Sequence, residues 1–299
     1  MNRMGPLRRT QLDTASIASD EVSAFIPLDG DRLRAALDRQ SVGAGCPNHW
    51  DARVVATTSS TNSDLLREAR GGHAFTRPVL LAAEIQTAGR GRLGRTWHSA
   101  PGASLTVSYA LHVARRLAEL EGISLVCGLA VRDALLNHGV RAELKWPNDV
   151  LVDARKLAGI LVEAHALASS TIVIVGIGLN VLPGGFDRAG GDRRALPGSD
   201  LRSAGCMVED RNELAADLAL ALEKRLARFA ETGFPEFASE WNAADALRDS
   251  LVSLGTTPGE IVTGFERGVD RSGGLLIEID GTRKRFIAGD LSLRATGLA

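Results

Sequence analysis

Three apolar runs of strand length most constrain what this chain can fold into. They are PVLLAAEIQ at residues 78–86, ASLTVSYAL at residues 103–111 and STIVIVGIGLNV at residues 170–181. Short apolar runs of this kind are typical of strands buried inside a sheet. A long apolar helix is expected around residues 117–138, and an amphipathic helix at residues 212–231, where leucines recur every four residues. The pattern therefore predicts a sheet with helices packed on it.

Two further segments place polar residues beside this sheet. WDARVVATT at residues 50–58 predicts a strand, and SDLLREARGG at residues 63–72 predicts a short helix that ends at a glycine pair. Ser60, Thr61 and Asn62 lie between the two. Residues 141–165 predict strand, tight turn and strand, with residues 153–155 in the hairpin.

The hydrophobic pattern of the sequence changes twice along the chain. Residues 1–48 are predicted to be an irregular lead-in with one short helical pattern at residues 29–40, too short and too poorly patterned for a helix-turn-helix domain. Residues 49–249 form the larger predicted domain. From residue 250 to residue 299, short β-type runs separated by glycine-rich turns predict a small barrel.

The charge balance limits the partners of this chain. Its 35 Lys and Arg residues are matched by 36 Asp and Glu residues, for a net charge of −1. Nucleic acid is therefore not expected as a partner of the whole surface, and any anion site must be local. The three cysteines show no CxxC pattern, and no signal peptide or apolar span of membrane length is recognised. We expect a cytoplasmic protein without membrane contact.

Residues 86–97, QTAGRGRLGRTW, combine three glycines with three arginines directly after an apolar run. Such a segment is often a solvated loop or a nonspecific RNA contact. Alternatively, glycine lets backbone N–H groups wrap around a phosphate while guanidinium groups supply charge-assisted hydrogen bonds. Two other features favour a ligand: KWPND at residues 145–149 precedes Lys156 and Gly159, and Gly176 and Gly178 interrupt a strand. Glycine inside a strand often marks a close approach to the backbone.

Four motifs together resemble the catalytic domain of the biotin protein ligases. They are TTSSTNSDLL, EIQTAGRGRLGRTW, KWPNDVLV followed by RKLAGILVE, and VGIGLNV, in the order and spacing of that family. The resemblance runs from about Val54 to the end of the chain, including the small C-terminal β-unit. The winged helix-turn-helix of the bifunctional ligase–repressors is not recognised, so the chain resembles a monofunctional ligase. The implied fold is α+β: a mixed β-sheet flanked by helices, as in class II synthetases and lipoate ligases, with an SH3-like β-barrel.

The resemblance also implies an activity and its participants. The family joins biotin to ATP with Mg²⁺, forming biotinyl-5′-adenylate and pyrophosphate, and then transfers the biotinyl group to a lysine of a carrier domain. The expected acceptor is the biotin carboxyl carrier protein of acetyl-CoA carboxylase. A homodimer is possible within the family, and no DNA binding is expected.

The resemblance assigns site residues by their match to the motifs. The biotin pocket is expected to contain Ser60, Thr61, Asn62, Gln86, Arg90, Gly91, Arg92, Lys156, Gly159, Leu161 and Gly178. The nucleotide is expected to contact Gly89, Arg92, Arg95, Trp97, Lys145, Asn148 and Asn180. The expected catalytic cations are Lys156, Arg92, Arg90 and Lys145, and no metal ligands are assigned. The arginine–glycine loop is hypothesised to close over the adenylate and keep water out.

Several of these residues have structural interpretations that the sequence leaves open. Ser60 or Thr61 could only cap a helix, and Lys156 could be a surface lysine of a hairpin. Trp97 and Trp146 could be core aromatics, while Asp149 could assist a metal, orient a lysine or shape a turn. At the level of function, the alternatives are a lipoate or octanoyl transfer enzyme, a DNA-binding biotin sensor and a protein that only binds biotin.

Overall fold

The larger unit is built on a seven-stranded mixed sheet, as expected. A computed structural model describes residues 26–44, 50–73, 75–184, 196–257 and 260–293. The strand order is β1 (Asp51–Thr58), β2 (Val79–Gln86), β3 (Ser104–Val113), β7 (Thr171–Asn180), β6 (Arg155–Ala166), β5 (Asp149–Val152) and β4 (Glu143–Lys145). Strands β1 and β2 are parallel, and every other neighbouring pair is antiparallel. The three apolar runs form β2, β3 and β7, which lie inside this sheet.

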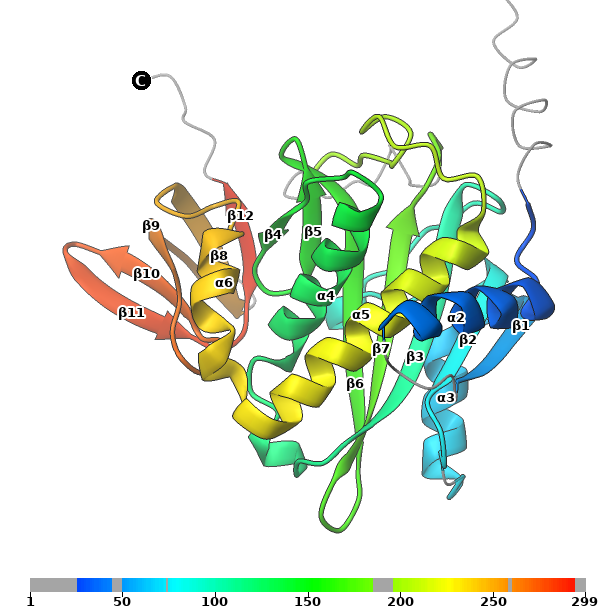
Figure 1. Ribbon diagram of the computed structural model, residues 1–299. Coiled ribbons are helices and arrows are strands. Elements are labelled where there is room, and N and C mark those ends of the chain that lie inside the picture. Colours follow the sequence, from blue (N-terminus) through cyan, green and yellow to red (C-terminus); the bar gives the residue numbers. More distant parts are fainter. Residues whose placement is uncertain (1–25, 45–49, 74, 185–195, 258–259, 294–299) are drawn as a thin grey trace, which may run out of the picture.

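Helices cover both faces of this sheet. Helices α2 (Gly30–Ala44), α4 (Ile123–Asn137) and α5 (Arg211–Thr232) lie on one face, and α3 (Thr61–Arg70) lies on the other (Figure 1). Alternation along β2 explains the division, because Leu80 belongs to the core beneath the three helices while Leu81 packs beneath α3. Because α3 is short, part of the face of the sheet on which it lies is not covered by a helix and remains open for a cleft. In the described residues, no helix is both long and apolar enough to span a bilayer.

Shorter elements complete the larger unit. The helix expected from residue 117 is divided at Gly122 (φ 79°) into a 3-10 turn, η2 (Leu117–Glu119), and α4. After α5, the chain forms a second 3-10 turn, η3 (Phe234–Glu236), and the short helix α6 (Ala238–Ala243). A third such turn, η1 (Arg92–Gly94), lies in the arginine–glycine loop.

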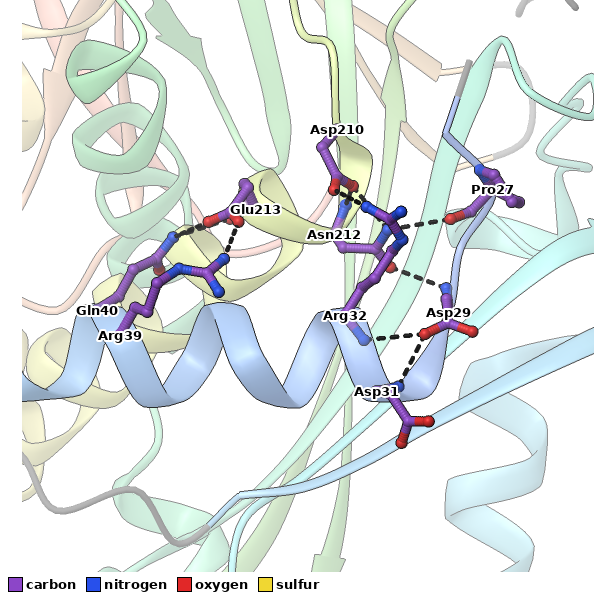
Figure 2. Close-up of polar contacts among 9 residues, drawn as sticks. All are labelled: Pro27, Asp29, Asp31, Arg32, Arg39, Gln40, Asp210, Asn212 and Glu213. Atoms are coloured by element: carbon purple, nitrogen blue, oxygen red, sulfur yellow. Dashed lines mark hydrogen bonds and ion pairs between the residues drawn. The ribbon is translucent and has the colours of Figure 1, made fainter. Parts of the chain in front are cut away.

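Part of the predicted lead-in packs closely on the larger unit. In α2, Leu33, Ala36 and Leu37 are fully buried in the core beneath α5. Figure 2 shows the polar contacts that join the start of α2 to the start of α5. The Asn212 amide donates to Pro27 O at 3.0 Å and accepts from the Asp29 N–H at 2.9 Å. The Asp29 carboxylate in turn accepts from the N–H of Arg32, which caps the helix.

The C-terminal unit is a five-stranded antiparallel sheet. Its order is β11 (Thr282–Phe286), β10 (Leu275–Ile279), β9 (Glu260–Val269), β8 (Leu251–Thr257) and β12 (Asp290–Leu293). The expected small β-unit is confirmed, but the expected barrel is not closed over the described residues. Strands β11 and β12 lie at opposite edges of the sheet, and no hydrogen-bonded ladder joins them. The two units contact each other through Trp146, whose indole N–H donates to Gly273 O at 3.2 Å.

Candidate active site

Two rows of directly paired residues cross the sheet on the α3 face. The first row joins Lys145, Asp149, Gly159, Gly178 and Thr106 on five successive strands. The second row joins Leu161, Gly176 and Ser108. Directly paired residues point to the same face of a sheet. The two rows therefore form a floor of small residues that ends in a lysine and a carboxylate.

A cleft lies over these rows. The start of α3, the arginine–glycine loop and the β5–β6 hairpin form its walls, and Gly289 of the C-terminal unit also lines it. Most of the predicted site residues meet here: Ser60, Thr61, Asn62, Gln86, Arg90, Gly91, Arg92, Arg95, Trp97, Lys145, Asn148, Lys156, Gly159, Leu161 and Gly178.

One end of the cleft carries uncharged hydrogen-bonding groups. The Thr61 hydroxyl lies 2.7 Å from the Ser108 hydroxyl, and the Thr61 N–H donates to Gln86 Oε1 at 2.9 Å. Ser108 also donates to Asn62 Oδ1 at 2.8 Å. Ser60 lines the cleft and, at 3.5 Å, accepts from the Ser63 N–H as the cap of α3. Ser60 therefore caps α3 and lines the cleft at the same time.

The strand glycines make room for two side chains. A Cβ atom at Gly176 would lie 2.5 Å from Asn62 Oδ1, and one at Gly178 would lie 2.2 Å from the Trp97 ring. Such distances are far below van der Waals contact, so neither position accepts a larger residue without movement. Side chains of the same chain, Asn62 and Trp97, approach these glycines closely, and the expected approach of a ligand stays a prediction. Trp97 lies over them in the cleft, whereas Trp146 is 2% exposed and belongs to the core.

The other end of the cleft is cationic. Asp149 bridges two lysines, with its carboxylate 3.1 Å from Lys145 Nζ and 2.6 Å from Lys156 Nζ. Burial favours the protonated acid, but the two lysine charges and their hydrogen bonds outweigh it and hold the pKa of Asp149 below its usual value. Asp149 is therefore ionised and orients both ammonium groups.

A β-bulge turns Lys156 into the cleft. Lys156 and Gly159 are three residues apart, so simple alternation would place them on opposite faces. The register shifts by one residue between Val150 and Leu151, which leaves Leu157 unpaired and opposes Lys156 to Leu151. Leu157 and Ala158 are both buried in the core on the helix side. The extra residue re-aims the lysine, as bulges beside active sites commonly do, and Lys156 is not a surface hairpin residue.

The arginine–glycine loop is a small hairpin over the cleft. Arg90 pairs with Thr96, and the Gly91 N–H donates to Arg95 O at 2.7 Å. At its tip, Leu93 has φ 55° and is 73% exposed. The Arg92 guanidinium reaches Asn148 Oδ1 at 3.4 Å. The loop thus presents arginine side chains toward the cleft from a turn of strained, exposed backbone.

Comparisons with known proteins match both units. Residues 54–180 match the biotin/lipoate A/B protein ligase family, and residues 252–294 match the biotin protein ligase C-terminal domain. The biotin--[acetyl-CoA-carboxylase] ligase of Mycobacterium tuberculosis is 36% identical over 276 residues, which cover 88% of this chain and 98% of that protein. The chain belongs to the biotin protein ligase family.

Two further relatives agree with this membership. The bifunctional ligase/repressor BirA of Salmonella typhimurium is 35% identical over 270 residues, covering 90% of this chain and 79% of that protein. Among solved structures, the biotin protein ligase from Aquifex aeolicus in complex with biotin and ATP superimposes with a TM-score of 0.67 at 28% identity. That match covers 82% of this chain and 99% of the other.

Two residues that the family resemblance assigned do not line the cleft. Asn180 is 1% exposed, and its amide donates to Ser199 O at 2.9 Å and Lys156 O at 3.4 Å. Gly89 is buried and accepts from the Trp97 N–H at 2.9 Å. The structure therefore places both behind the lining, where they support the backbone of Lys156 and the position of Trp97.

The sequence motifs assigned no role to two residues whose contacts shape the cleft. Ser108 lies in an apolar run, and only its pairing with Gly176 would have placed it in the floor. Glu163 is the last residue of the RKLAGILVE motif, where no role was assigned to it, and it contacts Arg90 and Asn62, which are distant in sequence. Because side chains alternate along a strand, Glu163 points to the same face of the sheet as Gly159 and Leu161, and this alternation could have predicted its position.

Proposed function

We propose that this chain is an ATP-dependent biotin protein ligase. It activates biotin as biotinyl-5′-AMP with release of pyrophosphate and then transfers the biotinyl group to a lysine of a biotin carboxyl carrier protein. The observation that carries this proposal is one cleft with uncharged hydrogen-bonding groups at one end and Lys145, Lys156 and Arg92 at the other. Biotin has a polar ureido edge and an anionic carboxylate, so it matches this polarity.

In the first half-reaction, a carboxylate oxygen of biotin attacks the α-phosphorus of ATP. The bond from that phosphorus to the bridging oxygen breaks, and pyrophosphate leaves. Two anions must approach each other, and cations fixed in advance lower the barrier by stabilising the negative charge of the transition state. Asp149 holds Lys145 and Lys156 in place for this role. Arg92 adds a third cation from the loop.

Mg²⁺ would neutralise phosphate charge in this step. In the described residues, no group of three or more His, Cys, Asp or Glu side chains could hold a metal. Mg²⁺ is commonly bound through substrate phosphates with one or two protein carboxylates. The oxygen donors beside the lysines, Asn148 Oδ1 and the Asp149 carboxylate, fit a metal that enters with the nucleotide.

In the second half-reaction, the amine of the carrier lysine attacks the carbonyl carbon of the mixed anhydride. The carbon–oxygen bond to AMP breaks, and the amine loses one proton as the amide forms. The acceptor we propose is the carrier protein of acetyl-CoA carboxylase, because the ligase of Mycobacterium tuberculosis bears that name. We also propose a cytoplasmic protein without DNA binding, which a gel shift at moderate salt would test. Size-exclusion chromatography distinguishes a monomer from the homodimer that the family permits.

We further propose which part of the chain forms each functional unit. Residues 49–249 form the biotin- and ATP-binding unit and residues 250–299 the smaller β-unit, with residues 1–48 as the segment before them. Helix α2 packs on the catalytic unit, so the segment before residue 49 contributes to its core.

The test of the proposal is transfer of biotin to a carrier. The purified protein is incubated with biotin, MgATP and a biotin-carrier domain, and the mass of the carrier is measured. We expect a mass increase of one biotinyl group, and none when the carrier lysine is replaced by arginine. A parallel reaction with lipoate distinguishes the other branch of the matched family. Modification by lipoate and not by biotin would overturn the proposal.

A further inference from the structure

Glu163 connects two parts of the site that are far apart in sequence. It lies on β6, opposite Ile174, one row beyond the floor of the cleft and on the same face. Its Oε1 is 2.8 Å from the Arg90 guanidinium, and its Oε2 accepts from the Asn62 amide at 2.9 Å. The Glu163 side chain is 18% exposed and does not line the cleft. It therefore acts on a ligand only through its partners.

The Asn62 contact continues into the polar end of the cleft. With its N–H₂ group committed to Glu163, Asn62 turns its Oδ1 atom to the Ser108 hydroxyl. A chain of hydrogen bonds then runs from Ser108 to Thr61 and on to Gln86. An amide can adopt two orientations, and a carboxylate that only accepts hydrogen bonds selects one of them. Leu161 O accepts from the same N–H₂ group at 3.3 Å, so Glu163 and this carbonyl together fix which atoms the biotin-contact network presents.

The Arg90 contact continues into the arginine–glycine loop. Arg90 uses its second guanidinium nitrogen to donate to Ser63 Oγ at 2.9 Å, so the base of the loop is fastened both to β6 and to α3. Arg90 pairs with Thr96 across the loop, on either side of the exposed tip at Leu93. Charge-assisted hydrogen bonds of this kind are about twice as strong as neutral ones.

We propose that Glu163 is a positioning residue that anchors the arginine–glycine loop to the biotin-contact network. Arg90 is then mainly the anchor of the loop, while Arg92 reaches toward Asn148 and the nucleotide end of the cleft. The Glu163 carboxylate thereby couples the positions of the side chains in the biotin-contact network to the position of the loop. This inference rests on the proposed function, because its readouts use biotin and biotinyl-adenylate.

The test compares Glu163→Gln with Glu68→Gln. Glu68 is the matched control: it lies on α3 and pairs with Arg53 at 2.9 Å, away from the cleft. Glutamine at position 163 keeps the size of the side chain, but it loses the charge. We expect biotinyl-adenylate to dissociate about tenfold faster from Glu163→Gln, the loss that about 1.4 kcal/mol of binding energy represents. Trypsin should also cleave the unliganded loop faster, and Glu68→Gln should match wild type in both assays.

A double-mutant cycle separates anchoring from a general structural defect. If Glu163 acts through Arg90, then Glu163→Gln, Arg90→Gln and the double variant should release adenylate at rates within about twofold of one another. If Glu163→Gln does not fold, Arg90→Gln replaces it in the test, because this variant removes the same ion pair at its more exposed partner. Additive effects, or a Glu163→Gln protein with wild-type loop cleavage and release, would overturn the inference. Failure of the wild-type protein to bind biotin would instead overturn the proposed function.

Discussion

At the scale of single residues, the position of Lys156 depends on contacts that can be removed one at a time. Its ammonium group lies 2.6 Å from Asp149 and 5.6 Å from the centre of the Trp97 ring, so an anion and an aromatic face both hold it in the cleft. If Lys156 acts on the reacting phosphate, as proposed, these contacts place it there without prior reorganisation.

Replacement of Lys156 by methionine removes this charge and keeps most of the side-chain volume. We expect the rate of pyrophosphate release with biotin and MgATP to fall on the order of 100-fold, because one preorganised charge is lost from the transition state. The control is Arg155→Met, since Arg155 is exposed and donates to Gly198 O outside the cleft. Equal pyrophosphate release by Lys156→Met and wild type would remove Lys156 from the mechanism.

Gly178 has an equally specific role. In Gly178→Ala, the new methyl group would meet the Trp97 ring at 2.2 Å, so the indole must leave its place over the sheet. We expect binding of a non-hydrolysable ATP analogue, measured by calorimetry, to weaken by about tenfold or more, in line with the usual cost of overpacking. Gly128→Ala in α4 is the matched control, with its nearest contact at an ordinary 3.4 Å from Leu144. Unchanged affinity in Gly178→Ala would show that Trp97 is not needed there.

At this scale, the sequence predicted residues that carry a local motif and missed those that depend on register. Gly176 and Gly178 stand out because glycine is unusual within a strand. Ser108 carries no such local signal, and Glu163 stands in the RKLAGILVE motif without a role assigned to it, because the places of both in the sheet depend on pairing with distant strands. Lys156 was expected in the site from its motif, but the bulge that aims it is not visible in the sequence.

At the scale of elements, the arginine–glycine loop differs from the strands that flank it. Strands β2 and β3 are buried in the sheet, whereas the loop between them has an exposed tip held by a few backbone hydrogen bonds. Closing such a loop costs conformational entropy, which contacts between its arginines and a bound anion can offset. The loop is therefore expected to tighten when the adenylate forms.

Limited trypsin digestion tests this expectation. We expect cleavage after Arg92 or Arg95 to slow by about tenfold with biotin and MgATP together, and to slow less with either alone, because the adenylate needs both. Strand β11 offers an internal control: Arg283 and Lys284 are exposed and should be cleaved equally in all conditions. The same cleavage rate in the loop with and without both substrates would contradict a closing loop.

The arrangement of the elements was less predictable than their existence. Apolar runs predicted β2, β3 and β7, because burial on both faces leaves a clear composition signal. The adjacency of β3 and β7 did not follow, since it joins residues up to 76 positions apart, as between Ser104 and Asn180. Helix α2 looked like part of an irregular lead-in, because its stability comes from burying Leu33 and Leu37 against a distant helix.

At the scale of the whole molecule, the two units share both the cleft and a buried acidic contact. Gly289 of the smaller unit lines the cleft, and Gly273 O of that unit accepts from the Trp146 indole N–H. Between the units, Glu266 of β9 is fully buried and Asp245 is partly buried, and each keeps one buried carboxylate oxygen without a hydrogen-bond donor. Two adjacent carboxyls in such a place favour the protonated form.

Stability should therefore fall as the pH rises. Burial, and then the charge of Asp245, raises the pKa of Glu266 to about 8, although Arg248 lowers it, while burial raises the pKa of Asp245 to about 6. The native protein then binds more protons than the unfolded chain between the ordinary value of 4.5 for glutamate and about 8. The free energy of unfolding decreases across that interval and becomes flat above it.

Glu266→Gln tests this linkage, because glutamine resembles the protonated acid and cannot ionise. We expect the variant to gain stability relative to wild type as the pH rises, with the largest gain near pH 8. Its free energy of unfolding should depend less steeply on pH between pH 5 and pH 8 than that of wild type. Urea unfolding at a series of pH values measures both. Ser253→Ala on β8 is the control, since it alters a partly buried hydrogen bond without removing a titratable group. A Glu266→Gln protein with the wild-type slope would show that this carboxyl is ionised in the native state and that the contact between the units does not depend on its proton.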